Sequence, residues 1–450
     1  MAKTSELNML SGSIWDKLII FAIPLALTGV LQQLLNAADV AVLGQFVGKN
    51  AMAAVGNNIS LIGLLVNLFL GLSLGANVII AQNIGARRLE NVKSAVHTAT
   101  LLAVYMGMAV TIFGESMTDL VLDMMAVPVS VREMAETYFR IYLLGMPVIG
   151  LYNFEAAIFR SRGDTKTPLI SLTAASLLNI VLNLLFVVKF DWGVAGVAWA
   201  TVIANGVSAL ILLNTLRKID STIKLNIKDL RINRECLREI VRIGLPAGIQ
   251  GMVFSLSNLL IQAAINDLGP DAMAASAAAF TIEINVYCVV NAFAQATTTF
   301  VGQNYGAKKL LRCRRITWVA MGLNAVFMGI LSVFILYFAE NLLGFFNPDP
   351  NVIALGKIRL WYVVAPEIIC VLLEGFSGAL RGYGISLPPA IIALIGICSI
   401  RIAWLYTVFA ADPGYATLML VYPVSWLVTT IFTGIAYFYA LRHLEPKRSA

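Results

Sequence analysis

The sequence predicts an all-α polytopic membrane protein, with twelve transmembrane helices in two parallel six-helix repeats around a central cavity. Hydrophobic residues make up 59% of the 450 residues and charged residues only 13%, which excludes an ordinary soluble domain. Apolar runs of about 20 residues, long enough to cross a bilayer, recur along the whole chain. Short sequence segments also recur at a fixed offset, which indicates an internal duplication.

The apolar runs are expected to form helices, because barrel strands would alternate in polarity at every residue and these runs do not. The twelve predicted spans are, in chain order, residues 18–43, 51–80, 94–114, 135–158, 168–189, 193–216, 241–267, 273–302, 315–338, 357–380, 387–409 and 415–440.

The two halves of the chain match each other in order. Residues 82–89 (QNIGARRL) match residues 303–310 (QNYGAKKL) at an offset of 221. Further matches near that offset relate residues 51–54 to 272–275, Arg160, Gly163 and Pro168 to Arg381, Gly384 and Pro389, Pro24 and Asn36 to Pro246 and Asn258, and Arg140 and Pro147 to Arg359 and Pro366.

Each copy has an even number of spans, so both copies cross the membrane in the same orientation. The predicted organisation is an N-lobe (1–216, spans 1–6), a cytoplasmic basic linker (217–240) and a C-lobe (241–450, spans 7–12). Parallel repeats of this kind are typical of transporters that expose a site between two lobes to each side in turn. A duplication that builds only a scaffold is the alternative.

Basic residues mark one side of the membrane. Of the 32 Lys and Arg residues, six lie on one side, Arg401 lies within a span, and the remaining 25 lie on the other side. The positive-inside rule therefore places both termini in the cytoplasm. The basic linker is interpreted as a topology signal and headgroup contact, with the lipid bilayer and not nucleic acid as its partner.

Cysteine and histidine usage argues against redox, metal and enzyme chemistry. The five cysteines have no CxxC spacing, and there are only two histidines, so we expect no disulfide, no metal site, no cofactor and no enzyme activity. No Walker motif is present, which argues against ATP as the energy source.

Three motifs carry a family resemblance. They are the segment from Pro24 to Gly44 (P-x6-LQQLLNAADVAVLG), the repeated QNxGA followed by two basic residues, and the R-x-x-G-D-x-K-x-P turn from Arg160 to Pro168. Together they resemble the multidrug and toxic compound extrusion (MATE) family, in particular its prokaryotic DinF-like type. The resemblance covers nearly the whole chain, and it implies multidrug efflux of small organic substrates across the bacterial cytoplasmic (inner) membrane by a monomeric protein.

A polar stripe in the first span contains the only aspartate in the interior of a predicted span. Thr28, Gln32, Asn36 and Asp39 follow the spacing i, i+4, i+8 and i+11, which places them on one helix face. Asp39 lies about 33 Å along the helix from Lys17, in the outer half of the membrane. A carboxyl there is poorly solvated, so it can take up and release a proton near neutral pH. A carboxylate that only reaches water or caps a neighbouring helix is the alternative.

Two further spans of the first half offer partners to Asp39. Asn179 and Asn183 share a face of the fifth span, and Thr201 and Asn205 share a face of the sixth. Such groups also tie helices together without binding an ion. The family resemblance implies ion coupling by Asp39, Asn179, Asn183 and Thr201, to which we add Asn36. Ile261 stands at the position that matches Asp39 in the second half, so the fold itself does not require this carboxylate.

The second half carries polar groups on spans seven, eight, ten and eleven. Sodium-coupled relatives place carboxylates on spans seven and ten, whereas span seven here has the amides Asn258 and Gln262. The coupling ion is therefore predicted to be H⁺, with Na⁺ left open. Glu155 and Glu374 are expected to pair locally with Arg160 and Arg381. The roles of Glu283, Glu367 and Arg401 stay open, and the candidate substrate-binding residues are Gln32, Asn205, Tyr138, Tyr142, Met106, Asn258, Gln262 and Glu283.

The leading functional hypothesis is a secondary antiporter that exports lipophilic, cationic organic compounds in exchange for protons. A flippase for lipid-linked precursors, from the same superfamily, is an alternative, but it would need several cationic residues in the cavity, where Arg401 stands alone. Sodium-coupled efflux is a second alternative. A membrane-embedded enzyme would need a catalytic group of residues at one depth, and only Asp39 is available.

Overall fold

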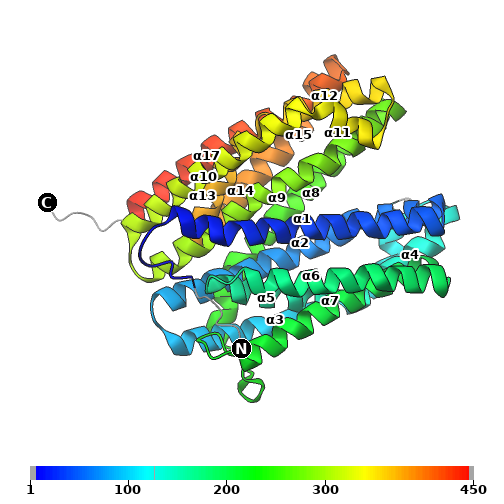
Figure 1. Ribbon diagram of the computed structural model, residues 1–450. Coiled ribbons are helices and arrows are strands. Elements are labelled where there is room, and N and C mark those ends of the chain that lie inside the picture. The colour runs from blue at the N-terminus through cyan, green and yellow to red at the C-terminus, as the bar shows by residue number, and fades with distance from the viewer. Residues whose placement is uncertain (1–6, 126, 445–450) are drawn as a thin grey trace. The chain divides into compact units, whose positions relative to one another are not determined.

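The computed structural model describes residues 7–125 and 127–444, and every regular element in these ranges is helical (Figure 1). The helices are α1 Trp15–Phe46, α2 Lys49–Gly85, α3 Leu89–Met124, α4 Val129–Leu144, α5 Met146–Ser161, α6 Lys166–Asn183, η1 Leu184–Lys189, α7 Gly193–Lys218, η2 Ile227–Asp229, α8 Arg234–Asp267, α9 Pro270–Gly306, α10 Leu310–Tyr337, α11 Ala339–Phe346, α12 Pro350–Val364, α13 Glu367–Gly382, α14 Leu387–Ala393, η3 Leu394–Ser399, α15 Ile400–Trp404, η4 Leu405–Phe409, α16 Tyr415–Met419 and α17 Val421–Leu444.

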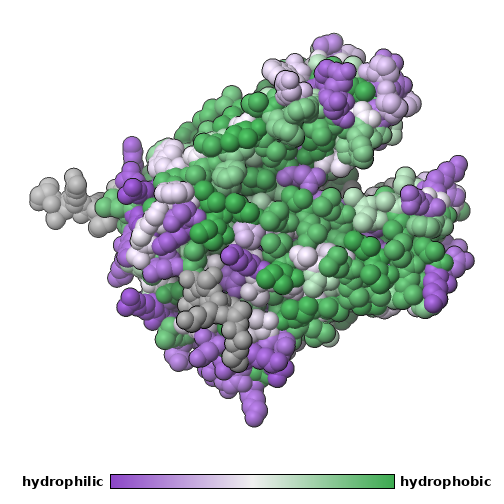
Figure 2. All heavy atoms as spheres, viewed as in Figure 1, coloured by the Kyte–Doolittle hydropathy of each residue, from purple (hydrophilic) through white to green (hydrophobic). Residues whose placement is uncertain are grey.

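Within the described ranges, eleven helical segments are long and apolar enough to cross a membrane, and α4 and α5, bent by 49°, supply a twelfth as a pair. Large apolar side chains such as Ile112, Phe113, Ile330 and Val333 are exposed on the helix sides, and Figure 2 shows hydrophobic residues along the helices with hydrophilic residues gathered at their ends. Such surfaces suit lipid rather than water. The prediction of a twelve-span, multi-pass membrane protein is confirmed.

The chain forms two compact units that exchange the first parts of the helices α1 and α8. One unit includes Leu27–Gly248, and the other includes Met9–Ala26 and the chain from Ile249 onwards. Helices α1 and α8 therefore each pass from one unit to the other, shortly after Pro24 and Pro246, which lie inside them. Proline lacks the N–H that would bond to the preceding turn, so each helix has a weakened point close to the unit boundary.

Helix packing within the two units follows one scheme. In the first unit, α5 packs against α2, α3 and α7, and α6 packs against α7. In the second unit, α13 packs against α9, α10 and α17, and α14 packs against α17. These are the helices that the sequence repeat relates to one another, so the second unit repeats the packing of the first.

The repeat extends to the backbone of the turns. Arg87 has a φ of 57°, and Lys308, its counterpart in the second half, has a φ of 58°. Left-handed backbone is uncommon for residues with a side chain, so its presence at both positions indicates one inherited turn. The π-helical segments η1 and η4 also begin at equivalent positions of the repeat, Leu184 and Leu405.

A close helix crossing in the first unit depends on four glycines. A Cβ atom added at Gly71 of α2 would lie 2.1 Å from the backbone nitrogen of Gly248 on α8, and one added at Gly75 would lie 2.8 Å from the nitrogen of Gly244. Both helices therefore present a small-xxx-small pair at the contact, which lets their backbones approach as closely as transmembrane helices can.

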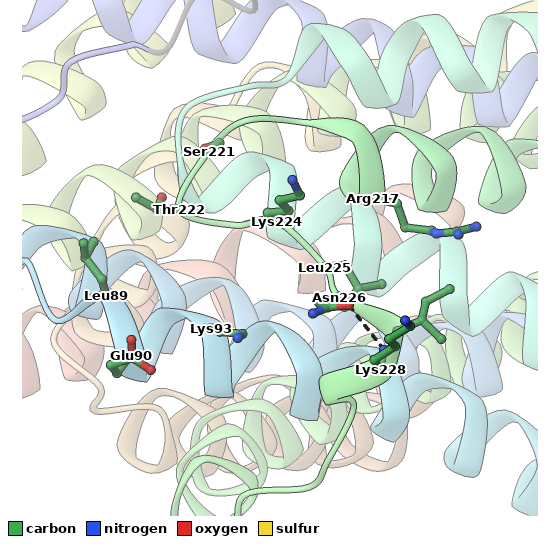
Figure 3. A pocket seen from close by; sticks show the side chains of 11 residues that line it. Leu89, Glu90, Lys93, Arg217, Ser221, Thr222, Lys224, Leu225, Asn226 and Lys228 are labelled. Atoms are coloured by element: carbon green, nitrogen blue, oxygen red, sulfur yellow. Dashed lines mark hydrogen bonds between the residues drawn. The ribbon is translucent and has the colours of Figure 1, made fainter.

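The linker between the repeats is anchored to the first unit. Ile223 and Leu225 are buried in its hydrophobic core, and Lys93 of α3 donates a hydrogen bond to Asp229 at 2.8 Å. A pocket of about 670 Å³ lies between the start of α3 and the linker (Figure 3). Its charged lining residues are Glu90, Lys93, Arg217, Lys224 and Lys228. None of the residues predicted to couple ions or bind substrate lines this pocket.

Candidate functional site

Asp39 is buried in the first unit, with 5% of its surface exposed. Asn183 Nδ2 donates a hydrogen bond to Asp39 Oδ1 at 2.6 Å, and Thr201 Oγ1 donates to Asp39 Oδ2 at 2.9 Å. Each carboxyl oxygen thus has one neutral donor, from α6 and from α7. Within the described part of the chain no Lys, Arg or His forms an ion pair with Asp39, so neutral groups alone stabilise its charge.

Asn179 joins the two donors to each other. Asn183 Nδ2 also donates to Asn179 Oδ1 at 3.1 Å, and Asn179 Nδ2 donates to Thr201 Oγ1 at 3.3 Å. The four side chains from α1, α6 and α7 therefore form a closed ring of hydrogen bonds. Asn179 and Asn183 point the same way because they are four residues apart in regular helix. The helix widens to π geometry directly after Asn183, a feature that is frequent at functional sites.

The amide oxygen of Asn183 is the unsatisfied group of this ring. Asn183 Oδ1 is buried and has no hydrogen-bond partner. A carboxylate needs a donor from Asn183, whereas a protonated carboxylic acid has an O–H that needs an acceptor. Rotation of the Asn183 amide would exchange its NH₂ for its oxygen. Because Asn183 Nδ2 also donates to Asn179 Oδ1, the Asn179 amide would have to rotate with it, and the two amides together can then serve both protonation states of Asp39.

The remaining predicted residues of the first unit do not join the ring through their side chains. Asn36 is exposed and Gln32 is half-buried, and neither forms a hydrogen bond to Asp39. Asn205 Nδ2 donates to the backbone oxygen of Thr201 at 2.9 Å, which supports the backbone at that point. Tyr138 and Tyr142 of α4 form a tilted ring contact with centroids 6.1 Å apart, and the half-buried Met106 packs against the core of the unit.

Three predicted residues of the second unit have protein partners. Glu283 and Arg359 form a buried, two-pronged ion pair, with Arg359 Nε and Nη2 donating to the two Glu283 oxygens at 2.8 and 2.9 Å. Asn258 Oδ1 accepts from Arg401 Nη1 at 2.8 Å. Gln262 is exposed and donates to Asn266 at 3.0 Å.

Sequence reasoning missed several contacts in the second unit. Arg359 was known only as the repeat match of Arg140, and nothing in its spacing pointed to Glu283, which lies on a different span. Tyr422 and Ser425 were also missed as neighbours of Arg401. The available signal was that Arg401, a charged residue within a span, requires polar neighbours.

One of the two expected local ion pairs is present. Arg381 lies 3.6 Å from Glu374, as predicted. The expected pair of Glu155 with Arg160 was wrong, because both Glu155 oxygens are buried without a hydrogen-bond partner. The helix explains the difference: residues seven apart return to the same face, whereas residues five apart diverge by about 140°.

Comparisons with known proteins agree with the fold and the motifs. The family profile described as MatE matches residues 24–185 and 246–407, one block in each half. Over 400 residues the chain is 27% identical to the probable multidrug resistance protein YoeA of Bacillus subtilis, which covers 87% of this chain and 86% of that protein. It is 24% identical over 464 residues to a Shewanella oneidensis protein named FAD transporter, with 98% of each chain covered.

A solved structure gives the same fold. The outward-facing conformation of a multidrug resistance MATE family transporter of the MOP superfamily has a TM-score of 0.91 at 23% identity, with 99% of both chains covered. The fold is therefore shared along the whole length, and the two profile matches together cover well over half of the sequence. On this evidence the chain belongs to the MatE family.

Proposed function

We propose that this protein is a secondary antiporter that exports lipophilic, cationic organic compounds in exchange for protons, with Asp39 as the proton carrier. As a member of the MatE family it is a membrane transporter and not an enzyme. The names of relatives such as the Bacillus subtilis multidrug resistance protein support drug-like substrates. We further propose a bacterial cytoplasmic membrane, cytoplasmic termini and a monomer as the working unit.

The observation that carries the proposal is the ring around Asp39. A buried carboxyl with no cationic partner is neutral or charged according to small changes in its surroundings. Its neighbours can stabilise either state, since Asn183 offers a donor and, after rotation together with Asn179, an acceptor. Proton binding and release at Asp39 can therefore be coupled to movement of the helices that supply the ring.

Sodium coupling is the second candidate, and the unpartnered Asn183 oxygen favours it. A sodium ion takes oxygen ligands, and the Asp39 carboxylate, Asn183 Oδ1 and Thr201 Oγ1 lie in one ring. The flippase hypothesis has weaker support, because Arg359 and Arg381 are paired with carboxylates. Among the buried cations that the structure describes in the second unit, only Arg401 lacks such a partner.

Transport by the full chain in proteoliposomes tests the proposal. We expect a pH gradient to drive ethidium accumulation with wild type, and Asp39→Asn to abolish it. Asp271→Asn, which removes an exposed carboxylate that has no ion-pair partner among the described residues, is the matched control and should transport normally. Unchanged pH-driven transport by Asp39→Asn would refute proton carriage by this residue. Accumulation driven by a sodium gradient at constant pH would instead establish the second candidate.

A further inference from the structure

Arg401 is the largest fully buried side chain of the second unit, with 1% of its surface exposed. Its Nη1 donates to Asn258 Oδ1 at 2.8 Å, and its Nε lies 3.5 Å from Ser425 Oγ. The ring of Tyr422 lies under the guanidinium, 4.5 Å from Cζ. All three neighbours are uncharged, so polar and aromatic groups orient Arg401 without neutralising it.

Arg359 lies against the same tyrosine ring as Arg401, but it has a carboxylate partner and, in the part of the chain that the structure describes, Arg401 does not. Arg359 lies 5.7 Å from the Tyr422 ring and is paired with Glu283 through two hydrogen bonds. Within the described residues no carboxylate forms an ion pair with Arg401, and its Nη2 makes no hydrogen bond to the protein. A buried charge without a counter-charge is unfavourable, which makes an anion the missing partner.

The sequence repeat places Arg401 at the counterpart of the Asp39 site. Helix α8, the stretch from α14 to α15, and α17 of the second unit correspond to α1, α6 and α7 of the first. Asn258 matches Asn36, and Tyr422 matches Thr201 at the offset of the repeat. The same three helices thus surround a carboxyl group in one unit and a guanidinium in the other. The corresponding helices therefore carry buried groups of opposite charge in the two units, although at positions that do not match each other, since Arg401 matches Ile180 and Asp39 matches Ile261.

We infer that Arg401 recognises an anionic group, a carboxylate or a phosphate, on the transported compound. The inference rests on the proposed transport function and adds to it a preference, among cationic amphiphiles, for those that also carry an acidic group. A guanidinium suits this role, because its planar array of N–H donors matches the oxygens of carboxylate and phosphate. Nη2 supplies the free donor, and Asn258, which accepts from Nη1, is only half-buried.

Binding of two matched dyes to the purified full chain tests this inference. Rhodamine B carries a carboxylate, and its ethyl ester has the same cationic ring system without the negative charge. By fluorescence anisotropy at about neutral pH we expect wild type to bind rhodamine B about tenfold more tightly than the ester, as one charge-assisted contact allows. Arg401→Gln should remove this preference. Arg442→Gln, which changes the net charge equally at an exposed position, should keep it.

Each outcome decides the inference. Equal affinity of wild type for the two dyes, or binding of neither, would overturn it, as would a preference that survives in Arg401→Gln. If Arg401→Gln does not fold, Arg401→Lys replaces it and should reduce the preference, because lysine keeps the charge but loses the planar donors. If wild type binds rhodamine B in preference to the ester but a pH gradient does not drive transport of the ester, the proposed antiport is contradicted. The anion site at Arg401 is then still supported.

Discussion

The glycine crossing between α2 and α8 gives a sharp prediction about stability. Replacing Gly71 with alanine would place Cβ 2.1 Å from the Gly248 nitrogen, whereas ordinary contact begins at 3.4 Å. The two backbones must therefore separate by more than an ångström, because neither contact atom can rotate away. Overpacking of this kind costs about 1–3 kcal/mol. Gly63 on the same helix has open space around its added Cβ, and alanine there should stabilise the helix by about 0.5–1 kcal/mol.

The two variants are compared by thermal unfolding of the purified protein, monitored by intrinsic tryptophan fluorescence. We expect Gly71→Ala to lower the unfolding midpoint and Gly63→Ala to raise it slightly. Helix propensity favours alanine equally at both positions. The difference between the two unfolding midpoints therefore reports the effect of the close contact between α2 and α8. A Gly71→Ala protein as stable as Gly63→Ala would refute the close contact between α2 and α8.

Two further changes test charged pairs. Arg359→Met leaves the buried Glu283 carboxylate unpaired and should lower the free energy of unfolding by about 3–5 kcal/mol. Adding Glu283→Gln to this variant should recover most of the lost stability. Equal stability of the single and double variants would contradict the ion pair. Lys93 holds the pKa of Asp229 below its ordinary value of 3.8, chiefly through the hydrogen bond to its carboxylate. A lowered carboxyl pKa contributes stability that is present above the unfolded-state pKa and lost as pH falls through the folded-state pKa. In wild type, the linker amides should therefore lose protection from hydrogen exchange below about pH 4, after correction for intrinsic exchange rates. In Lys93→Met, the linker should show low protection at every pH. The same pH profile in both proteins would count against the ion pair of Lys93 with Asp229.

The spans could be predicted because hydrophobic length depends on sequence alone. The breaks within them were not predicted. The span expected at 135–158 is two helices, α4 and α5, and the span expected at 357–380 is α12 followed by α13. Pro147 and Pro366 lie at these breaks. Each proline was recognised as part of the repeat, but whether a proline bends a helix or only begins a new one depends on what packs beside it.

The ring around Asp39 was predictable in its members and not in its geometry. Helical spacing placed Asn179 and Asn183 on one face, and the family resemblance linked them to Asp39 and Thr201. The unsatisfied oxygen of Asn183 has no sequence signal, because it results from the orientation of one amide. The surroundings of Arg401 were likewise beyond sequence reasoning, since its contacts join three separate spans of the second unit.

Because the units exchange helix segments, neither half of the chain contains all the residues of one unit. A chain cut within the linker would give an N-terminal fragment that contains residues 9–26, which belong to the second unit, and a C-terminal fragment that contains the part of α8 up to Gly248, which belongs to the first. Neither fragment holds a complete unit. Both exchanged segments end at equivalent positions of the repeat, after Ala26 and after Gly248. We therefore expect co-expressed halves to complement each other and neither half to fold alone.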